Sequence, residues 1–280
     1  GSGGAVGNPI LEHPAGRAVS FTGSCEVGGG LYEKATKRRI RVQLEMGGKN
    51  PTIVLKDSNL DYAADVLVNG AFFSTGQKCT ACSRAVIEEP IYDALVEKLV
   101  AKTRALKVGN GLEAGVAIGP AVDKAQLETD LKYIEIGKQE GAKLLCGGKR
   151  LTGGAYDKGY FVEPTLFDGV TPEMRIAQEE IFGPVLGLMR ARDFEHAMQL
   201  ANGVKFGLSA SIVTKDVERV HQFTNRIEAG LITVNLPTAG VEYQLPFGGT
   251  KESSFGMREQ GPQAMDFYTE TRTVYLKYTQ

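Results

Sequence analysis

The chain has 280 residues, which is enough for one large α/β domain or two smaller ones, since domains usually run to about 100–200 residues. Its composition, 42% hydrophobic and 23% charged, is typical of a soluble globular protein with an apolar core. The formal net charge of −1 offers no basic field that would attract nucleic acid or an anionic membrane. No apolar run is long enough to cross a bilayer and no signal peptide opens the sequence. We therefore expect a cytoplasmic protein that binds neither nucleic acid nor a membrane.

The cysteines and histidines are few and irregularly spaced. Four cysteines in a chain of this length do not form a disulfide framework, which indicates a reducing compartment. The three histidines show no spacing typical of a metal site, so no metal is expected. These residues are Cys25, Cys79, Cys82 and Cys146, and His13, His196 and His221.

The sequence begins with Gly1-Ser2-Gly3-Gly4 rather than with Met. A Gly-Ser start is typical of an expression scar. The alternative is that a longer protein has been cut, so that residues needed for activity lie outside these 280. Both interpretations stay open.

The first predicted unit is a strand, a small-residue turn and a helix. Residues 18–24 favour a short buried strand, three glycines follow at 28–30, and residues 31–37 favour a helix. In this geometry backbone N–H groups and the helix dipole can bind phosphate. The spacing from Gly23 to Gly28 matches neither the dinucleotide fingerprint nor a complete P-loop, so a plain strand–helix turn is the alternative.

Strands and helices then alternate along the chain, which predicts βαβ units and a mostly parallel sheet. Ile40–Met46 alternates apolar and polar residues, which predicts a half-buried strand with Glu45 on its polar face. Tyr268–Tyr278 favours a terminal strand that either edges the sheet or pairs with another subunit. The other predicted strands are 53–55, 84–88, 143–146, 160–167, 185–190, 209–213 and 231–235, and the helices are 60–73, a helix opened by Pro90, 123–139, 193–202 and 217–227.

The most informative stretch runs from Phe72 to Arg84, where Cys79 follows a glycine on a turn between a helix and a strand. Reactive side chains are often carried on such turns. A thiol nucleophile and a base such as Glu45 are the two parts that acyl chemistry by covalent catalysis requires. The alternatives are a structural cysteine, a redox Cys-x-x-Cys formed with Cys82, and an exposed Glu45 paired with Arg41.

A series of short motifs covers essentially the whole chain. These segments are Phe21-Thr22-Gly23-Ser24 with Gly28, Leu44-Glu45-Met46-Gly47-Gly48, Gly76-Gln77-Lys78-Cys79, Glu180-Ile181-Phe182-Gly183-Pro184-Val185, Asn235, Pro246-Phe247-Gly248-Gly249, Lys251, Ser254, Gly256, Arg258-Glu259 and Tyr268-Thr269-Glu270. Taken in this order, they resemble the aldehyde dehydrogenase superfamily, and they match only the later, larger part of such a protein.

This resemblance implies a role for each matching residue. Cys79 would attack an aldehyde to form a thiohemiacetal, and hydride transfer to NAD or NADP would leave a thioester. Glu45 would activate the hydrolytic water, which favours release of a free acid over transfer to coenzyme A. The residues implied in cofactor binding are Gly23, Ser24 and Gly28 at the pyrophosphate, Glu180 and Phe182 at the nicotinamide ribose, and Gly47 and Gly48, which leave the cofactor's path to Cys79 open.

The resemblance also implies an α/β fold in three parts and a class of substrate. Residues 1–47 would end a Rossmann-like cofactor domain, 48–247 would form the catalytic domain, and 248–280 would return and supply an oligomerisation strand for a homodimer or homotetramer. Residues 235–245 and 253–260 are most similar to members acting on α-ketoglutarate semialdehyde, with succinate or another short semialdehyde as alternatives. The candidate substrate-pocket residues are Phe73, Lys78, Thr80, Thr238 and Phe247.

The family's oxyanion-hole asparagine and its adenosine-binding residues do not precede Gly1. The Cys79 backbone N–H is then the one oxyanion donor in the chain, and loss of one such donor typically costs on the order of 10²–10³ in turnover. We therefore expect the 280 residues alone to be inactive or nearly so. Two rival interpretations are a non-catalytic binding or scaffold protein of the same fold and a Cys-x-x-Cys thiol oxidoreductase.

Overall fold

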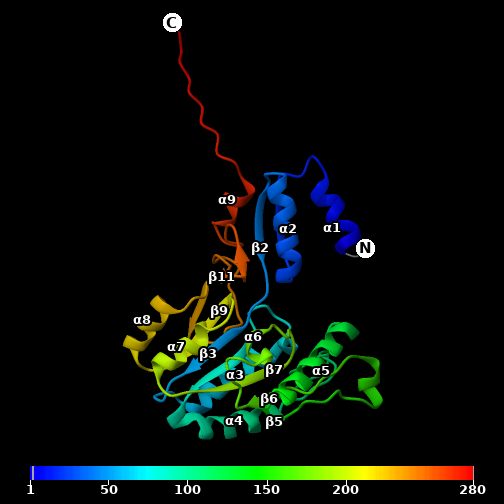
Figure 1. The fold of residues 1–280 in the computed structure, drawn as a ribbon, viewed down its shortest axis with the longest axis vertical. Helices are drawn as coiled ribbons and strands as arrows, with labels where there is room; N and C mark the ends of the chain where they lie inside the picture. The colour runs from blue at the N-terminus through cyan, green and yellow to red at the C-terminus, as the bar shows by residue number, and fades with distance from the viewer. Residues whose placement is uncertain (2, 280) are drawn as a thin grey trace. The chain divides into compact units, whose positions relative to one another are not determined.

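The computed structural model describes residues 1 and 3–279, and these divide into two compact units. The first comprises 1–46, 241–248 and 254–280, and the second comprises 47–240 and 249–253. The predicted division at 47/48 and 247/248 differs from these units because the chain enters the first unit again at Val241 and at Ser254. Figure 1 labels many of the helices and strands.

The first unit contains a three-stranded sheet of order β1–β2–β12. Its middle strand β2 (Arg41–Glu45) pairs in parallel with β1 (Ala18–Thr22) and antiparallel with β12 (Ser254–Phe255). Because β2 has a neighbour on each edge, Gln43 and Glu45 are buried as fully as Leu44. Gln43 and Glu45 of the predicted polar face therefore do not face solvent, whereas Arg41 at the start of the strand is half-buried. The helices of this unit are α1 (Gly3–Glu12), α2 (Cys25–Lys37) and α9 (Ala264–Tyr268).

Helix α2 begins six residues earlier than the sequence predicts and runs through the three glycines. Ser24 caps it, because the Ser24 hydroxyl accepts a hydrogen bond from the Val27 N–H at 3.3 Å. Gly28 packs closely on Met46, since a β-carbon there would lie 2.4 Å from the Met46 sulfur and would displace that side chain. Close packing against β2 thus outweighs the low helix propensity of glycine.

The second unit is built on a seven-stranded sheet of order β10–β9–β3–β4–β7–β6–β5. Every neighbouring pair is parallel except β5 with β6, so the prediction of a mostly parallel sheet is confirmed. Its strands are β3 (Asn50–Val54), β4 (Cys82–Glu88), β5 (Lys143–Cys146), β6 (Thr165–Asp168), β7 (Val185–Ala191), β9 (Ser209–Val213) and β10 (Leu231–Val234), and β8 (Phe206–Gly207) pairs separately with β11 (Thr250–Lys251).

Helices cover both faces of this sheet (Figure 1). The buried residues of α3 and α4 pack with Val54 and Ile87, whereas those of α5, α7 and α8 pack with Ile53 and Val86. Successive strand residues therefore point into different cores, as the period of two requires. The helices are α3 (Leu60–Phe72), α4 (Tyr92–Arg104), α5 (Lys124–Gln139), α6 (Arg175–Gln178), α7 (Phe194–Asn202) and α8 (Val217–Arg226), with short 3₁₀ turns η1 (Phe73–Gly76), η2 (Glu89–Ile91) and η3 (Gly154–Lys158).

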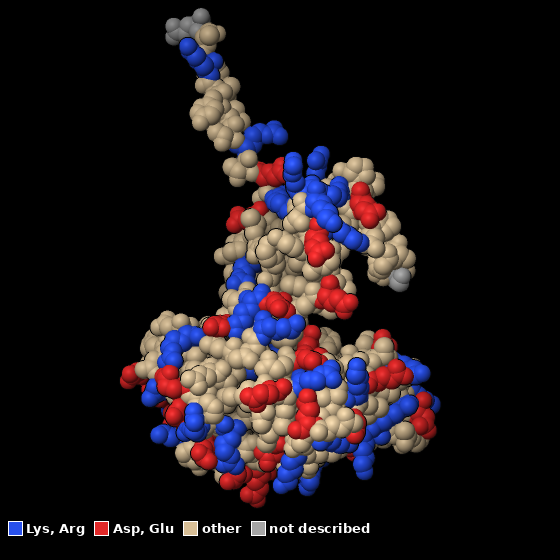
Figure 2. Space-filling view, in the orientation of Figure 1, with Lys and Arg blue, Asp and Glu red and all other residues tan. Residues whose placement is uncertain are grey.

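Two predicted strands differ from the structure. The strand expected over 160–167 is reduced to β6, because Pro164 lacks the N–H that a ladder needs. Residues 269–279 belong to no strand, since their backbone has no partner strand within the described chain. Among the described residues, no helix is both long and apolar enough to span a membrane. Figure 2 shows acidic and basic side chains interspersed on the visible face of the second unit.

Candidate active site

Cys79 lies on a turn that leads from helix α3 into strand β4. Ser74 and Thr75 adopt left-handed backbone angles with φ of 57° and 60°, and Gly76 follows with φ of 65°. These residues end the helix abruptly, because non-glycine residues enter that region only at a cost. The Ala81 N–H then donates to the Lys78 carbonyl at 3.0 Å and closes the turn around a half-buried Cys79.

The same turn packs against the loop that holds Glu180 and Phe182. A β-carbon at Gly76 would lie 2.3 Å from the Gly183 carbonyl oxygen, so the two backbones touch. A small cleft forms here, and it brings together Lys78, Glu180 and Phe182 of the sequence-predicted set. Phe182 is itself left-handed, with φ of 60°. The remaining lining residues are Gly48, Gly76, Ala81, Cys82, Ser83, Ile181, Gly183 and Val185.

The Glu180 carboxylate is held by the backbone that precedes β3. The Gly48 N–H donates to Glu180 Oε1 at 3.0 Å, and a β-carbon at Gly47 would lie 2.2 Å from Oε2. A side chain at position 47 would therefore displace the Glu180 carboxylate from its present place. Burial raises the pKa of Glu180, and the Gly48 hydrogen bond and the Lys49 charge oppose that rise.

Two buried cations beside this loop were not predicted from the sequence. Lys49 is 1% exposed, its Nζ has no hydrogen-bond partner among the described residues, and burial lowers its pKa to about 7. Arg84 is also buried, and its guanidinium donates to three backbone carbonyls, those of Lys49, Leu200 and Ala201, at 2.7–2.9 Å. Charged residues normally predict a solvated surface, so no sequence signal marks either position.

In the first unit, Glu45 ends strand β2 as a buried carboxyl. Ser254 Oγ donates to its Oε2 at 2.5 Å and Gln43 Nε2 to its Oε1 at 3.5 Å. Burial raises the Glu45 pKa to about 7, the Ser254 hydrogen bond opposes the rise, and the charge of Glu259 adds to it. The alternative of an exposed Glu45 paired with Arg41 is wrong, because Arg41 pairs with Glu270 instead.

The first unit also contains the strand–turn–helix expected at a phosphate site. Gly23 and Ser24 lie between β1 and α2, and the Gly23 N–H donates to the Glu45 carbonyl at 3.0 Å. The backbone amides at the start of α2 and the positive end of its dipole form the kind of site that binds an anion. Gly28 lies one turn into the helix, packed on Met46.

The remaining predicted pocket residues have varied surroundings. In the second unit Phe73 is 40% exposed at the end of α3, whereas Thr80 and Thr238 are buried. The Thr238 hydroxyl has no hydrogen-bond partner among the described residues. Phe247 belongs to the first unit, where its backbone forms a two-way bridge with Glu259. These four do not line the cleft that contains Lys78.

Cys82 is a poor candidate for a redox partner of Cys79. It is 2% exposed at the start of β4, and its sulfur lies 3.2 Å from the Thr52 hydroxyl. Burial raises the pKa of its thiol, which disfavours the thiolate that disulfide exchange needs. Among the described residues there is no cluster of three or more side chains suited to bind a metal ion.

Several known proteins are similar to this chain over nearly all of its length. The family described as "Aldehyde dehydrogenase family" matches residues 1–274. The α-ketoglutaric semialdehyde dehydrogenase of Bacillus subtilis is 50% identical over 99% of this chain and 57% of its own length. The 2,5-dioxopentanoate dehydrogenase of Saccharolobus solfataricus is 46% identical over 98% of this chain and 57% of its own length.

A solved structure, the NAD-dependent aldehyde dehydrogenase from Sinorhizobium meliloti, is similar with a TM-score of 0.92 and 40% identity, covering 96% of this chain and 53% of that one. The chain thus spans rather more than half the length of these relatives. The predicted family and fold class are confirmed: the chain belongs to the aldehyde dehydrogenase family.

Proposed function

We propose that the protein carrying this chain oxidises an aldehyde to the carboxylic acid through a thioester on Cys79, with NAD or NADP as hydride acceptor. The observation that carries the proposal is the turn at 78–81, which packs beside the loop containing Glu180. Membership of the family supports the reaction class.

The residues of each unit fit parts of such a cofactor. In the first unit, Gly23, Ser24 and the start of α2 would bind the pyrophosphate. In the second, Glu180 would accept hydrogen bonds from the ribose hydroxyls, and Phe182 would line the nicotinamide site. NAD is the first choice, because the similar Sinorhizobium enzyme is described as NAD-dependent.

In the proposed mechanism the Cys79 thiolate forms a C–S bond to the aldehyde carbon, and the Cys79 N–H donates to the developing oxyanion. A nicotinamide cofactor held by Glu180 and Phe182 would supply the hydride acceptor for that carbon, and Cys79 would then carry the acyl group as a thioester. Glu45 then accepts a proton from water, the water oxygen attacks the acyl carbon, and the thiolate leaves. A pKa of about 7 suits Glu45 to this role near neutral pH, because both of its protonation states are populated there.

We infer a short semialdehyde such as α-ketoglutarate semialdehyde as the substrate. Two of the relatives, at 50% and 46% identity, are named for this activity. The single carboxylate of the semialdehyde, at the end away from the aldehyde, needs a cation, and Lys78 is half-buried on the cleft beside Glu180. Exchange of Lys78 for Met should then raise KM for the semialdehyde more than KM for an uncharged aldehyde.

The test is NADH formation by the complete gene product that contains residues 1–280, with α-ketoglutarate semialdehyde as substrate. We expect Cys79→Ala to abolish turnover and Cys82→Ala to retain it. Equal loss in both variants, together with disulfide reductase activity in the parent, would favour the thiol oxidoreductase. No turnover with any semialdehyde, despite cofactor binding, would favour the scaffold protein.

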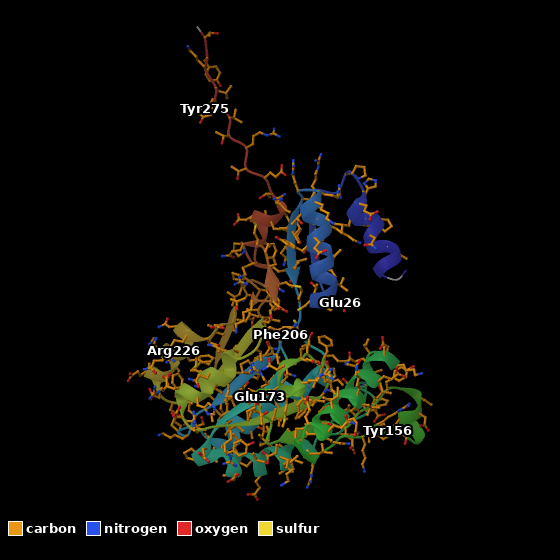
Figure 3. All side chains as sticks on the ribbon, viewed as in Figure 1. Glu26, Tyr156, Glu173, Phe206, Arg226 and Tyr275 are labelled. Atoms are coloured by element: carbon orange, nitrogen blue, oxygen red, sulfur yellow. The ribbon has the colours of Figure 1, made fainter. Side chains whose placement is uncertain are left out.

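We further propose that residues 268–278 supply the strand for a homodimer or homotetramer. Four large side chains of this tail, Val274, Tyr275, Leu276 and Tyr278, are 67–93% exposed. Figure 3 labels Tyr275 on this tail. Apolar side chains and open backbone groups on one segment favour pairing with another chain. Light scattering of the complete gene product should show an oligomer, and removal of residues 269–280 should reduce its mass to that of a smaller assembly. An unchanged mass would contradict the proposal.

A further inference from the structure

The side chain of Asn50 connects the starts of three neighbouring strands in the seven-stranded sheet, β3, β4 and β9. Asn50 is the first residue of β3, which lies between β9 and β4 in the sheet. Its Nδ2 donates to the carbonyls of Cys79 and Ala81, each at 2.8 Å. Its Oδ1 accepts from the Ser209 N–H at 3.0 Å. At 2% exposure, the Asn50 amide uses both of its functional groups within the protein.

These contacts restrain both peptide planes that flank the Cys79 α-carbon. The Cys79 carbonyl belongs to the following plane, and Asn50 holds it directly. The preceding plane contains the Lys78 carbonyl, which accepts from the Ala81 N–H at 3.0 Å. Since a peptide is planar, fixing the Lys78 carbonyl also fixes the Cys79 N–H. Asn50 acts on that plane indirectly, because it holds the carbonyl of Ala81, the residue whose N–H donates to the Lys78 carbonyl.

Gly48 supplies the space for this arrangement. A β-carbon at position 48 would lie 2.6 Å from the Cys79 carbonyl oxygen and 2.8 Å from Asn50 Oδ1. Such contacts would displace either the amide or the turn. The expected role of Gly48, to leave a path for the cofactor, thus has a competing explanation in the packing of its own chain.

A side-chain amide is suited to this position for a local reason. Residue 51 is proline, which has no N–H to donate, and the β3–β4 register shifts between Asn50 and Pro51. The ladder is therefore interrupted where β4 begins. The Asn50 amide donates to the carbonyls at that interruption, while Thr52 and the later residues resume the regular pairing.

We propose that Asn50 is a positioning residue for Cys79: its amide fixes the backbone angles of Cys79 and so the directions of the sulfur and of the N–H. This rests on the proposed function in taking Cys79 as the nucleophile. Misplacement of a reacting group by about 1 Å can cost about 10²-fold in rate. We expect loss of the amide donors to lower kcat tenfold to a hundredfold, with KM for the aldehyde changed less than threefold.

The experiment compares Asn50→Asp with Thr52→Val in the complete gene product. Asn50→Asp keeps the shape but loses both donors. Thr52→Val is the matched control, because Thr52 is equally buried on β3 and its hydroxyl contacts Cys82 rather than Cys79. Carbamidomethylation of Cys79 is followed against pH, with fragment-ion mass spectra separating it from Cys82, and kcat and KM are measured on the same samples.

The expected result is that Asn50→Asp slows alkylation of Cys79 at least tenfold and alters its pH profile, while Thr52→Val leaves both unchanged. Asn50→Ser, which keeps one neutral donor, should give an intermediate rate, and it replaces the Asp variant if that protein does not fold. A folded Asn50 variant with the parent's alkylation profile and kcat would overturn the proposal, as would equal slowing by Thr52→Val. If the parent oxidises no aldehyde, the proposed function fails, yet the alkylation measurement still decides whether Asn50 positions the thiol.

Discussion

Lys49 places an ammonium group in the core of the second unit, and its removal should stabilise that unit. Its folded-state pKa of about 7 lies below the ordinary value of 10.5. The folded state therefore binds fewer protons than the unfolded state between these two pH values. The destabilisation caused by burying the charged ammonium is absent above pH 10.5, grows as pH falls, and is complete below pH 7. At 1.36 kcal/mol per pKa unit, it reaches at most about 5 kcal/mol.

Replacement of Lys49 by Met keeps an unbranched chain of similar length and removes the titrating group. We expect Lys49→Met to be more stable than the parent by several kcal/mol at pH 6.5, with the difference nearly gone by pH 10. The backbone carbonyl of residue 49 still accepts from Arg84 in the variant, so that hydrogen bond is unaffected.

The assay is urea unfolding followed by far-UV circular dichroism, because the chain contains no tryptophan. Lys56→Met is the control, since it removes the same charge at an exposed position and should change the free energy of unfolding by less than about 0.5 kcal/mol. A Lys49→Met variant that is less stable at pH 6.5, or a difference that does not vary with pH, would mean that the ammonium has a stabilising partner and would refute the reasoning.

Two other predictions concern Asp130 of α5 and Gly76, both of which pack beside Gly183. Burial raises the pKa of Asp130 to about 7 from 3.8, so the folded state favours the protonated carboxyl. The free energy of unfolding should therefore fall, by at most about 4 kcal/mol, as pH rises through that interval. Asp130→Asn keeps the hydrogen bond from Gln126 and removes the titrating group, so its free energy of unfolding should differ little between urea titrations at pH 5 and pH 8. The same pH dependence of that free energy in variant and parent would contradict this prediction. Gly76→Ala should lower stability by at least about 2 kcal/mol, since a β-carbon there strains a left-handed residue and meets the Gly183 carbonyl. Gly141 is also left-handed, but a β-carbon there would have no atom within 4 Å, so Gly141→Ala should lower stability by only about 1 kcal/mol. Thermal melts of both variants compare the two losses, and equal losses would show that the contact with the Gly183 carbonyl is harmless.

Local patterns predicted most of the second unit because its elements begin and end on local signals. The side chains of Asn59 and Asp123 cap α3 and α5 where the sequence places the helix starts. On α4, Leu95 and Leu99 are buried, while Lys98 pairs with Asp61 of α3 at 2.8 Å, as the spacing of apolar residues implies. In these cases the residues that decide the structure are neighbours in sequence.

Features that depend on distant contacts were not predictable in this way. Strand β12 has two residues, and it exists because Ser254 pairs with Glu45, which is 209 positions away in the sequence. The same pairing buries Glu45, whereas the alternation around it predicts a half-exposed strand. Resemblance to the family marked Glu45 as a candidate base, but only the sheet supplies the burial that raises its pKa.

The segment 47–50 shows why single-sequence reasoning stops short of the site. Three of its residues are constrained by contacts with residues far along the chain. Gly47 packs against the Glu180 carboxylate, and Gly48 and Asn50 both contact the Cys79 carbonyl. Because Gly48 and Asn50 act on the same oxygen, their substitutions remove one arrangement rather than two independent contacts. The rate losses of Gly48→Ala and Asn50→Asp should therefore be less than additive in the double variant, as expected for residues that share a partner. Additive rate losses would mean that Gly48 and Asn50 affect Cys79 independently. In that case Gly48 would act through contacts other than its packing against the Asn50 amide.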